Sequence, residues 1–102
     1  MQRPVIISGA RTPIGRFGGA CKSFSASDLG AVAIKAALER SRVSPKIVDE
    51  VIIGNVLQAA EAGYAPRLAS LKAGIPQEVP VIAINRQCAS GLDAINIASD
   101  AI

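Results

Sequence analysis

Three short apolar runs and three longer segments of helical periodicity alternate along this chain. The short runs are rich in β-branched residues and bounded by turn-forming residues, which is typical of buried strands. They span residues 5–8, 51–56 and 79–84. In the longer segments, apolar residues recur at three- and four-residue spacing, which predicts helices. These helices are expected from just after Ser25 to about residue 42, over residues 66–73, and from residue 90 onward.

The order strand–helix, repeated three times, predicts the fold class. Connections of this length imply parallel strands joined by right-handed crossovers. Half of the 102 residues are apolar but only 3% are aromatic, so we expect a core of Val, Ile, Leu and Ala. This composition suits a layered α/β fold, with a mostly parallel sheet and helices on both faces, and it argues against disorder. The length fits one small domain or part of a larger one.

Local signals mark the ends of the predicted helices. Ser25 and Asp28 have the spacing of a capping box, in which each side chain binds the backbone N–H of the other residue. Ser44-Pro45 predicts a brief further turn, and Gly74 predicts the end of the second helix. Polar residues cover only about a third of the last helix, so we expect that helix to be largely buried.

The charges argue against several classes of partner. A net charge of +3 comes from 11 basic and 8 acidic residues, which are scattered without runs. Nucleic-acid-binding proteins cluster their basic residues, so we predict no nucleic-acid partner. No signal-type segment opens the chain, and no apolar run approaches the length of a membrane span. We therefore expect a soluble, cytoplasmic protein with no membrane partner.

The chain has two cysteines, Cys21 and Cys88, and no histidine. Their separation matches no metal-binding pattern, so we predict no metal site. A cysteine–histidine dyad cannot form within these residues. We expect a reducing compartment for this protein, and we interpret Cys21 as an incidental loop thiol.

A glycine-rich loop over residues 9–19 follows the first predicted strand and raises the question of phosphate binding. A Walker loop needs a Gly directly before its Lys and another five residues earlier. Before Lys22 these positions hold Cys21 and Arg16, and no G-x-G-x-x-G dinucleotide pattern occurs either. We therefore expect this loop to be structural.

Cys88 lies where the third predicted strand turns into the last helix. The thiolate is the reactive form of cysteine, and the unpaired amides at a helix N-terminus favour negative charge. The same amides can receive the oxyanion that develops when a thiolate attacks a thioester carbonyl. Ser90 and Gly91 are small, so we expect them to leave room for a substrate. The alternative is that Cys88 is a small buried hydrophobe, the commonest role of a free cysteine.

Four segments of the chain resemble the thiolases, enzymes that condense and cleave acyl-CoA compounds. The segment around Cys88 resembles the nucleophile motif of this family, and the other three segments appear in the family's order. They are Asn85-Arg-Gln-Cys-Ala-Ser-Gly-Leu-Asp-Ala-Ile95, Ile7-Ser-Gly-Ala-Arg-Thr-Pro-Ile-Gly-Arg-Phe-Gly-Gly19, Gly54-Asn-Val-Leu-Gln-Ala59 and Ala69-Ser-Leu-Lys-Ala-Gly-Ile-Pro76. The resemblance covers the N-terminal portion of the family, and the helical pattern shows no stop signal at residues 99–102. We therefore expect residues 1–102 to be the N-terminal part of a thiolase-like N-terminal domain, with its fold incomplete.

The resemblance implies an acyltransferase that forms or cleaves 3-ketoacyl-CoA, with Cys88 as its catalytic residue. Cys88 would take the acyl group as a thioester, and a second thiol or a carbanion would then receive it. Acyl-CoA is the implied substrate, no external cofactor is implied, and the assembly implied is a homo-oligomer. The family's later histidine, second cysteine and asparagine motifs are absent from these residues. We therefore expect this chain alone to be inactive.

Arg67 is the most notable charge outside the cysteine motif. Thiolases carry an arginine at the similar place, near the subunit interface, and we expect a structural role for it. In the family Pro-Ala precedes this arginine, whereas this chain has Ala65-Pro66, with Tyr64 at the place where the family usually has glutamine.

Two alternatives stand beside the thiolase interpretation. One is a non-catalytic, thiolase-like interaction module that pairs with another chain. The other is a related condensing enzyme of the ketoacyl-synthase type, which also has a cysteine at a helix start. The Arg11-Thr-Pro13 loop and the Asn85-Arg-Gln-Cys88 run favour a thiolase over a ketoacyl synthase.

Overall fold

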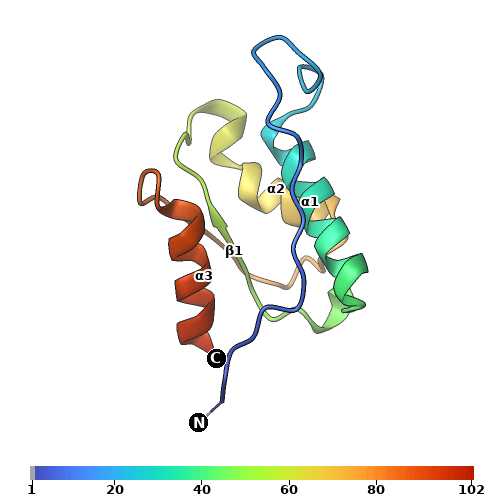
Figure 1. Cartoon of the computed structure of the whole chain (residues 1–102), viewed down its shortest axis with the longest axis vertical. Coiled ribbons are helices and arrows are strands. Elements are labelled where there is room, and N and C mark those ends of the chain that lie inside the picture. The colour runs from blue at the N-terminus through green and yellow to red at the C-terminus, as the bar shows by residue number, and fades with distance from the viewer. Residues whose placement is uncertain (1) are drawn as a thin grey trace.

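A two-stranded parallel sheet joins the helices of this fold (Figure 1). The computed structural model describes residues 2–102. Strand β1 (Val51–Gly54) pairs with strand β2 (Val81–Ile84), with Val51 opposite Val81 and Gly54 opposite Ile84. The second and third predicted strands are confirmed, although both are shorter than expected.

Three α-helices surround the sheet, as the sequence pattern predicts. They are α1 (Ala26–Ser41), α2 (Ala65–Lys72) and α3 (Ser90–Ala101). The short 3-10 helix η1 (Pro45–Ile47) follows Ser44, whose side chain accepts a hydrogen bond from the Lys46 amide. A second 3-10 helix, η2 (Ala60–Gly63), lies between β1 and α2.

The helices lie on both sides of the sheet, which confirms the layered α/β class. Helix α3 packs on β1 from one side, while α2 contacts β2 and also packs against α1 on the other side (Figure 1). Helices α1 and α2 approach closely, because a Cβ added to Gly30 would lie only 2.9 Å from the Cβ of Ala69. A glycine on α1 therefore allows the tight contact between these two helices.

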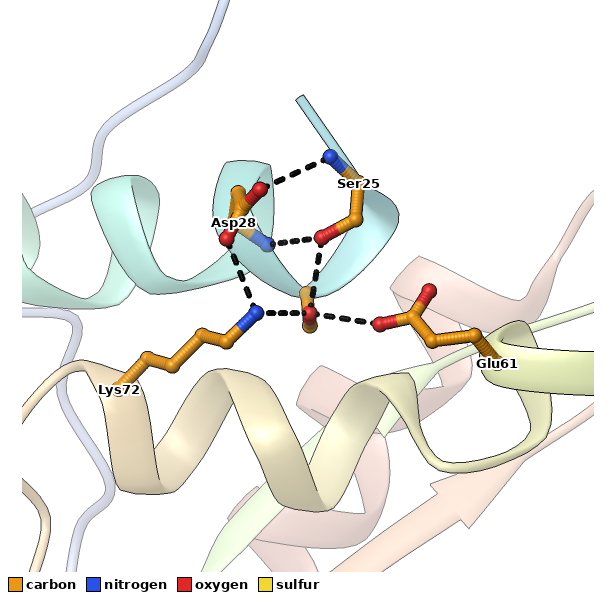
Figure 2. Close-up of polar contacts among 5 residues, drawn as sticks. Ser25, Asp28, Glu61 and Lys72 are labelled. Atoms are coloured by element: carbon orange, nitrogen blue, oxygen red, sulfur yellow. Dashed lines mark hydrogen bonds and ion pairs between the residues drawn. The ribbon is translucent and has the colours of Figure 1, made fainter. Parts of the chain in front are cut away.

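The predicted capping box begins α1. The Asp28 amide donates to the Ser25 hydroxyl at 3.1 Å, and the Ser25 amide donates to the Asp28 carboxylate at 3.0 Å. Lys72 at the end of α2 reaches the same carboxylate at 2.9 Å, as Figure 2 shows. These contacts hold the pKa of Asp28 at about 2, below its ordinary value of 3.8, chiefly through the Ser25 backbone N–H and then through Lys72.

A fully buried hydroxyl extends this polar cluster. Ser27 accepts a hydrogen bond from Lys72 at 2.6 Å and donates one to the Glu61 carboxylate at 2.8 Å. Glu61 belongs to η2, so the cluster joins η2 to the ends of both α1 and α2 (Figure 2). Buried hydroxyls need such partners, because an unpaired polar group loses its bonds to water without compensation.

The first predicted strand, residues 5–8, is not a strand, and that prediction is wrong. Val5, Ile6 and Ile7 are at least two-thirds exposed. The segment runs beside α1 (Figure 1), where the Ser8 hydroxyl donates to the Ala37 carbonyl at 2.6 Å and Arg40 donates to the Gly9 carbonyl at 2.9 Å. An apolar run specifies no pairing partner, and here bonds to the helix hold the segment outside the sheet.

The expectation that the last helix is largely buried is also wrong. Only Ser90 and Ala94 are buried on α3, while Leu92 and Ile95 are 65% and 52% exposed. Among residues 2–102, only the two-stranded sheet makes substantial contact with this helix. A sheet of two strands is too narrow to cover more than one side of a helix.

Arg67 has structural contacts. Its guanidinium donates to the carbonyls of Val79 at 2.9 Å and Gln77 at 2.7 Å, which ties α2 to the turn before β2. Within residues 2–102, no helix combines the length and the apolar character needed to cross a bilayer.

Candidate active site

The carboxyl ends of β1 and β2 meet at one edge of the sheet, and Cys88 follows this edge. Ligand sites of parallel sheets form at the carboxyl ends of strands, because the connecting loops and helix N-termini converge there. The Asn55 amide donates to the Ile84 carbonyl at 2.8 Å, so the pairing continues to the last residue of β2. Cys88 lies in the loop from Asn85 to Ala89, which joins β2 to α3.

This loop is tightly hydrogen-bonded to itself. The Ala89 amide donates to the Arg86 carbonyl and the Ser90 amide to the Gln87 carbonyl, both at 3.1 Å. Gln87 has a φ of 51°, in the left-handed region that non-glycine residues rarely adopt. The Cys88 amide donates none of the hydrogen bonds found in residues 2–102.

The side chain of Ser90 binds two backbone groups of this loop. Its hydroxyl accepts a hydrogen bond from the Arg86 amide at 2.8 Å and donates one to the Gln87 carbonyl at 2.6 Å. Ser90 is only 4% exposed. The Ser90 hydroxyl is therefore turned into the loop, and the expectation that this small residue leaves room for a substrate stays a prediction.

Gly91 has open space around it. A Cβ added to Gly91 would meet no atom within 4 Å, and the residue is exposed. Cys88 is exposed as well, so the interpretation of Cys88 as a small buried hydrophobe does not hold in this structure.

Gly54, the last residue of β1, sets the distance between the sheet and the start of α3. A Cβ at this position would lie 2.7 Å from the carbonyl carbon of Ser90 and 2.8 Å from the nitrogen of Gly91. Both are backbone atoms, so neither can turn away as a flexible side chain can. Only glycine allows this close approach, and no sequence signal at Gly54 indicates that role.

An ion pair joins the cysteine loop to the first turn of α3. Arg86 donates to the Asp93 carboxylate at 2.8 Å, with the arginine side chain 71% exposed. Asp93 lies in the first turn of α3, where a negative charge interacts favourably with the helix dipole. An exposed pair of this kind stabilises by at most about 1 kcal/mol. Its main effect is to hold Arg86 across the first turn of the helix.

The remaining candidates lie apart from this site or are absent. Cys21 has its sulfur 3.9 Å from the Pro13 carbonyl, in a different loop, and both cysteines are free. Residues 2–102 hold no group of three His, Cys, Asp or Glu side chains placed to bind a metal. An open apolar groove between β1 and α3 is lined by Ile52, Ile53, Ala94 and Ile95, and Cys88 is not among its lining residues.

The local geometry therefore presents an exposed thiol two residues before a helix of 12 residues. Helix N-termini stabilise anions through their unpaired amides and the helix dipole. Within residues 2–102, the Cys88 sulfur makes none of the hydrogen bonds found, so no acid–base side chain here is bonded to it. The backbone amides at such a terminus can receive an oxyanion, but no proton acceptor among the described residues is bonded to the sulfur.

Comparison with known proteins identifies the family. The profile described as the thiolase N-terminal domain matches residues 4–102. The chain belongs to the thiolase family. It is 52% identical over 102 residues to a probable acetyl-CoA acetyltransferase of Mycobacterium leprae. It is 51% identical over 98 residues to the acetyl-CoA acetyltransferase of Cupriavidus necator.

Solved thiolase structures share the fold. Human mitochondrial 3-ketoacyl-CoA thiolase in complex with CoA matches 92% of this chain with a TM-score of 0.86 and 46% identity. Acetyl-CoA acetyltransferase from Syntrophomonas wolfei matches 96% with a TM-score of 0.87 and 39% identity. The chain spans 24% and 25% of those two chains, and 26% and 25% of the two relatives above. It thus corresponds to about a quarter of a thiolase.

Proposed function

We propose that Cys88 is the nucleophile of a thiolase-type acyltransferase, which acts on acyl-CoA and 3-ketoacyl-CoA thioesters. The observation that carries this proposal is the place of Cys88. It is exposed, it follows the carboxyl edge of a parallel sheet, and it precedes the N-terminus of α3 within a thiolase-family chain. The names of the relatives, acetyl-CoA acetyltransferase and 3-ketoacyl-CoA thiolase, support the substrate class.

The proposed reaction has two stages. In the first, the Cys88 thiolate attacks the carbonyl carbon of the acyl donor and a carbon–sulfur bond to Cys88 forms. The bond to the leaving group breaks, and that group departs as the CoA thiolate or as the carbanion of acetyl-CoA. It then takes up one proton, which balances the proton that the Cys88 thiol lost. In the second stage, a CoA thiol or a carbanion of acyl-CoA takes the acyl group and releases Cys88. The oxyanion of each stage would be stabilised by free backbone amides such as that of Cys88.

We further propose that the proton-transfer groups come from outside residues 2–102. The chain has no histidine, and no acid or base is hydrogen-bonded to the Cys88 sulfur among the described residues. The chain covers only about a quarter of its relatives' length. Proton transfer by positioned side chains contributes typically about 10²–10⁴-fold to enzymatic rates. Without such groups, these residues supply the nucleophile but not a complete active site.

The test compares the two cysteines in the polypeptide expressed at the full length of its own gene. Thiolysis of acetoacetyl-CoA by CoA should be lost in Cys88→Ala, because no other thiol in this chain lies at the strand–helix junction. Cys21→Ala is the matched control and should keep the wild-type rate. Retained turnover in Cys88→Ala would contradict the assignment of Cys88 as the nucleophile. Absence of turnover in the wild type would favour a non-catalytic, thiolase-like module.

A further inference from the structure

Two side chains hold the backbone on the N-terminal side of Cys88 from opposite ends of its loop. Ser90, after the cysteine, bonds back to the Arg86 amide at 2.8 Å and to the Gln87 carbonyl at 2.6 Å. Asn85, before the cysteine, accepts a hydrogen bond from the Gln87 amide at 3.0 Å. All three bonds end on the two residues that immediately precede Cys88.

These bonds fix a backbone conformation that the chain would not otherwise favour. Gln87 has a φ of 51°, and its two backbone polar groups are the ones that Asn85 and Ser90 bind. Non-glycine residues in the left-handed region cost free energy, and such conformations persist where surrounding contacts determine them. The direction in which the chain enters Cys88 therefore depends on both side chains.

Ser90 is itself held in place by the sheet. It is 4% exposed, and the backbone of Ser90 and Gly91 lies directly against Gly54 at the end of β1. The hydroxyl therefore transmits the position of β1 to the cysteine loop. Arg86 has a second tie through Asp93, but that bond starts from an exposed guanidinium and does not fix the Gln87 backbone.

We propose that Ser90 and Asn85 are positioning residues for Cys88, which hold its thiol and its backbone amide in the geometry that attack on a thioester requires. This inference rests on the proposed function. Reacting atoms must be held within a fraction of an ångström for efficient attack, so loosening the loop slows the chemical step more than it weakens substrate binding. Neither side chain touches the reacting atoms in this assignment, and each acts through the loop backbone.

The test uses Ser90→Ala and Asn85→Ala in the polypeptide expressed at the full length of its own gene. The matched controls are Ser99→Ala and Asn96→Ala, which make the same changes on α3 at side chains with no hydrogen bond found in residues 2–102. Three quantities are measured for each variant. They are kcat and KM for thiolysis of acetoacetyl-CoA, the hydrogen-exchange rates of the Arg86 and Gln87 amides, and the thermal unfolding midpoint.

We expect kcat to fall about tenfold in Ser90→Ala and about threefold in Asn85→Ala, the effects of losing a buried and an exposed hydrogen bond, with KM unchanged. The Arg86 amide should exchange faster in Ser90→Ala and the Gln87 amide faster in Asn85→Ala. Asn85→Ser, whose hydroxyl can accept the same bond, should recover most of the loss. Both controls should match the wild type in all three measurements.

Each other outcome contradicts a definite statement. Ser90→Ala and Asn85→Ala variants that keep the wild-type kcat in an active enzyme would overturn the positioning role alone. Variants in which kcat and KM both change and the unfolding midpoint falls would do the same. A wild type without acyl transfer would overturn the proposed function and this inference with it. If Ser90→Ala does not fold, Asn85→Ala decides, because its side chain is exposed and the variant loses no buried group.

Discussion

The carboxylate of Asp28 shows how much a single side chain can organise in this chain. It accepts a hydrogen bond from the Ser25 amide, and this bond caps α1. It also forms an ion pair with Lys72, which joins α1 to α2. Both contacts favour its charged form and hold its pKa at about 2, below the ordinary 3.8. A carboxylate whose pKa is lower in the folded than in the unfolded state stabilises the folded state above the unfolded pKa.

The stabilisation from Asp28 should therefore be present above about pH 4 and should be lost as the pH falls from 3.8 towards 2. Unfolding midpoints of wild type and Asp28→Asn, measured between these pH values, provide the test. The wild type should be the more stable protein at the upper end, and the difference should shrink at the lower end. Asp100→Asn, an exposed carboxylate with no ion pair found in residues 2–102, is the matched control. A difference that stays constant with pH would contradict this view of Asp28.

Arg42 has a backbone conformation that is unfavourable for arginine and favourable for glycine. It ends α1 with a φ of 58°, and its amide bonds to the carbonyls of Glu39 and Leu38. Glycine adopts this conformation freely at helix ends. Arg42→Gly should therefore raise the free energy of unfolding by up to about 1 kcal/mol. Glu39→Gly, inside the same helix, should lower it by about 1 kcal/mol. Chemical denaturation measures both, and a loss of stability in Arg42→Gly would contradict the prediction.

The sequence predicts Cys88 as the candidate nucleophile, but it does not predict which side chains hold the loop around it. The strand-to-helix transition and the thiolase-like motif both point to Cys88. The sequence presents Ser90 only as a small residue, because spacing does not show that its hydroxyl turns back to bind the Arg86 amide. Serine often makes such local bonds to the backbone near helix starts. That tendency was the one signal available, and it does not say which backbone group is bound.

Among the elements, the junction of β1 and α3 depends most on one residue. Helix α3 starts directly against Gly54, where a Cβ would lie 2.7 Å from the Ser90 carbonyl carbon. The junction places the end of the strand, the cysteine loop and the first turn of the helix in contact. Any atom added there must push the helix away from the sheet.

Gly54→Ala should therefore destabilise the chain by about 1–3 kcal/mol, the usual cost of forcing atoms into a packed region. Gly91→Ala is the matched control on the other side of the contact, where an added Cβ meets nothing within 4 Å. It should be neutral or should stabilise α3 by about 0.5–1 kcal/mol, because alanine is the better helix former. Equal effects of the two substitutions on the unfolding midpoint would show that the close contact at Gly54 is unimportant.

The elements themselves follow the sequence pattern wherever local signals decide them. The Ser25 cap, the Gly74 stop and the turn after Ser44 all have the structures that these residues favour. Predictions failed where a partner decides the outcome. Residues 5–8 have the composition of a buried strand but make no strand pairing, and α3 has the composition of a buried helix but packs on one side only. The spacing of apolar residues shows which face of an element is apolar, but it does not show which other element packs on that face.

On the scale of the molecule, these residues match about a quarter of the length of the thiolase relatives. Large apolar side chains lie exposed along α3 and residues 5–7, among them Leu92, Ile95 and Ile6. The relatives' chains are about four times longer, and the class of the fold is shared with them. The family could be predicted from the sequence because four motifs occur in the order typical of thiolases. The layered fold class could be predicted because strand and helix patterns alternate along the chain.

Residues 1–102 expressed alone should show no thiolysis of acetoacetyl-CoA above the rate of the uncatalysed reaction. The reason is that no group among the described residues is bonded to the Cys88 sulfur to move its proton. The absorbance of the 3-ketoacyl-CoA measures this directly. The full-length polypeptide, assayed beside it under the same conditions, is the control. Turnover by residues 1–102 that is lost in Cys88→Ala would mean that they contain a complete active site.

The assignment of Cys88 as the acyl-carrying nucleophile is tested most directly by mass spectrometry. The full-length polypeptide is exposed briefly to acetyl-CoA without an acceptor, and its intact mass and its Cys88 peptide are measured. One acetyl group should be gained, it should lie on the Cys88 peptide, and it should leave when CoA is added. An acetyl group on another residue, or none at all, would contradict the assignment.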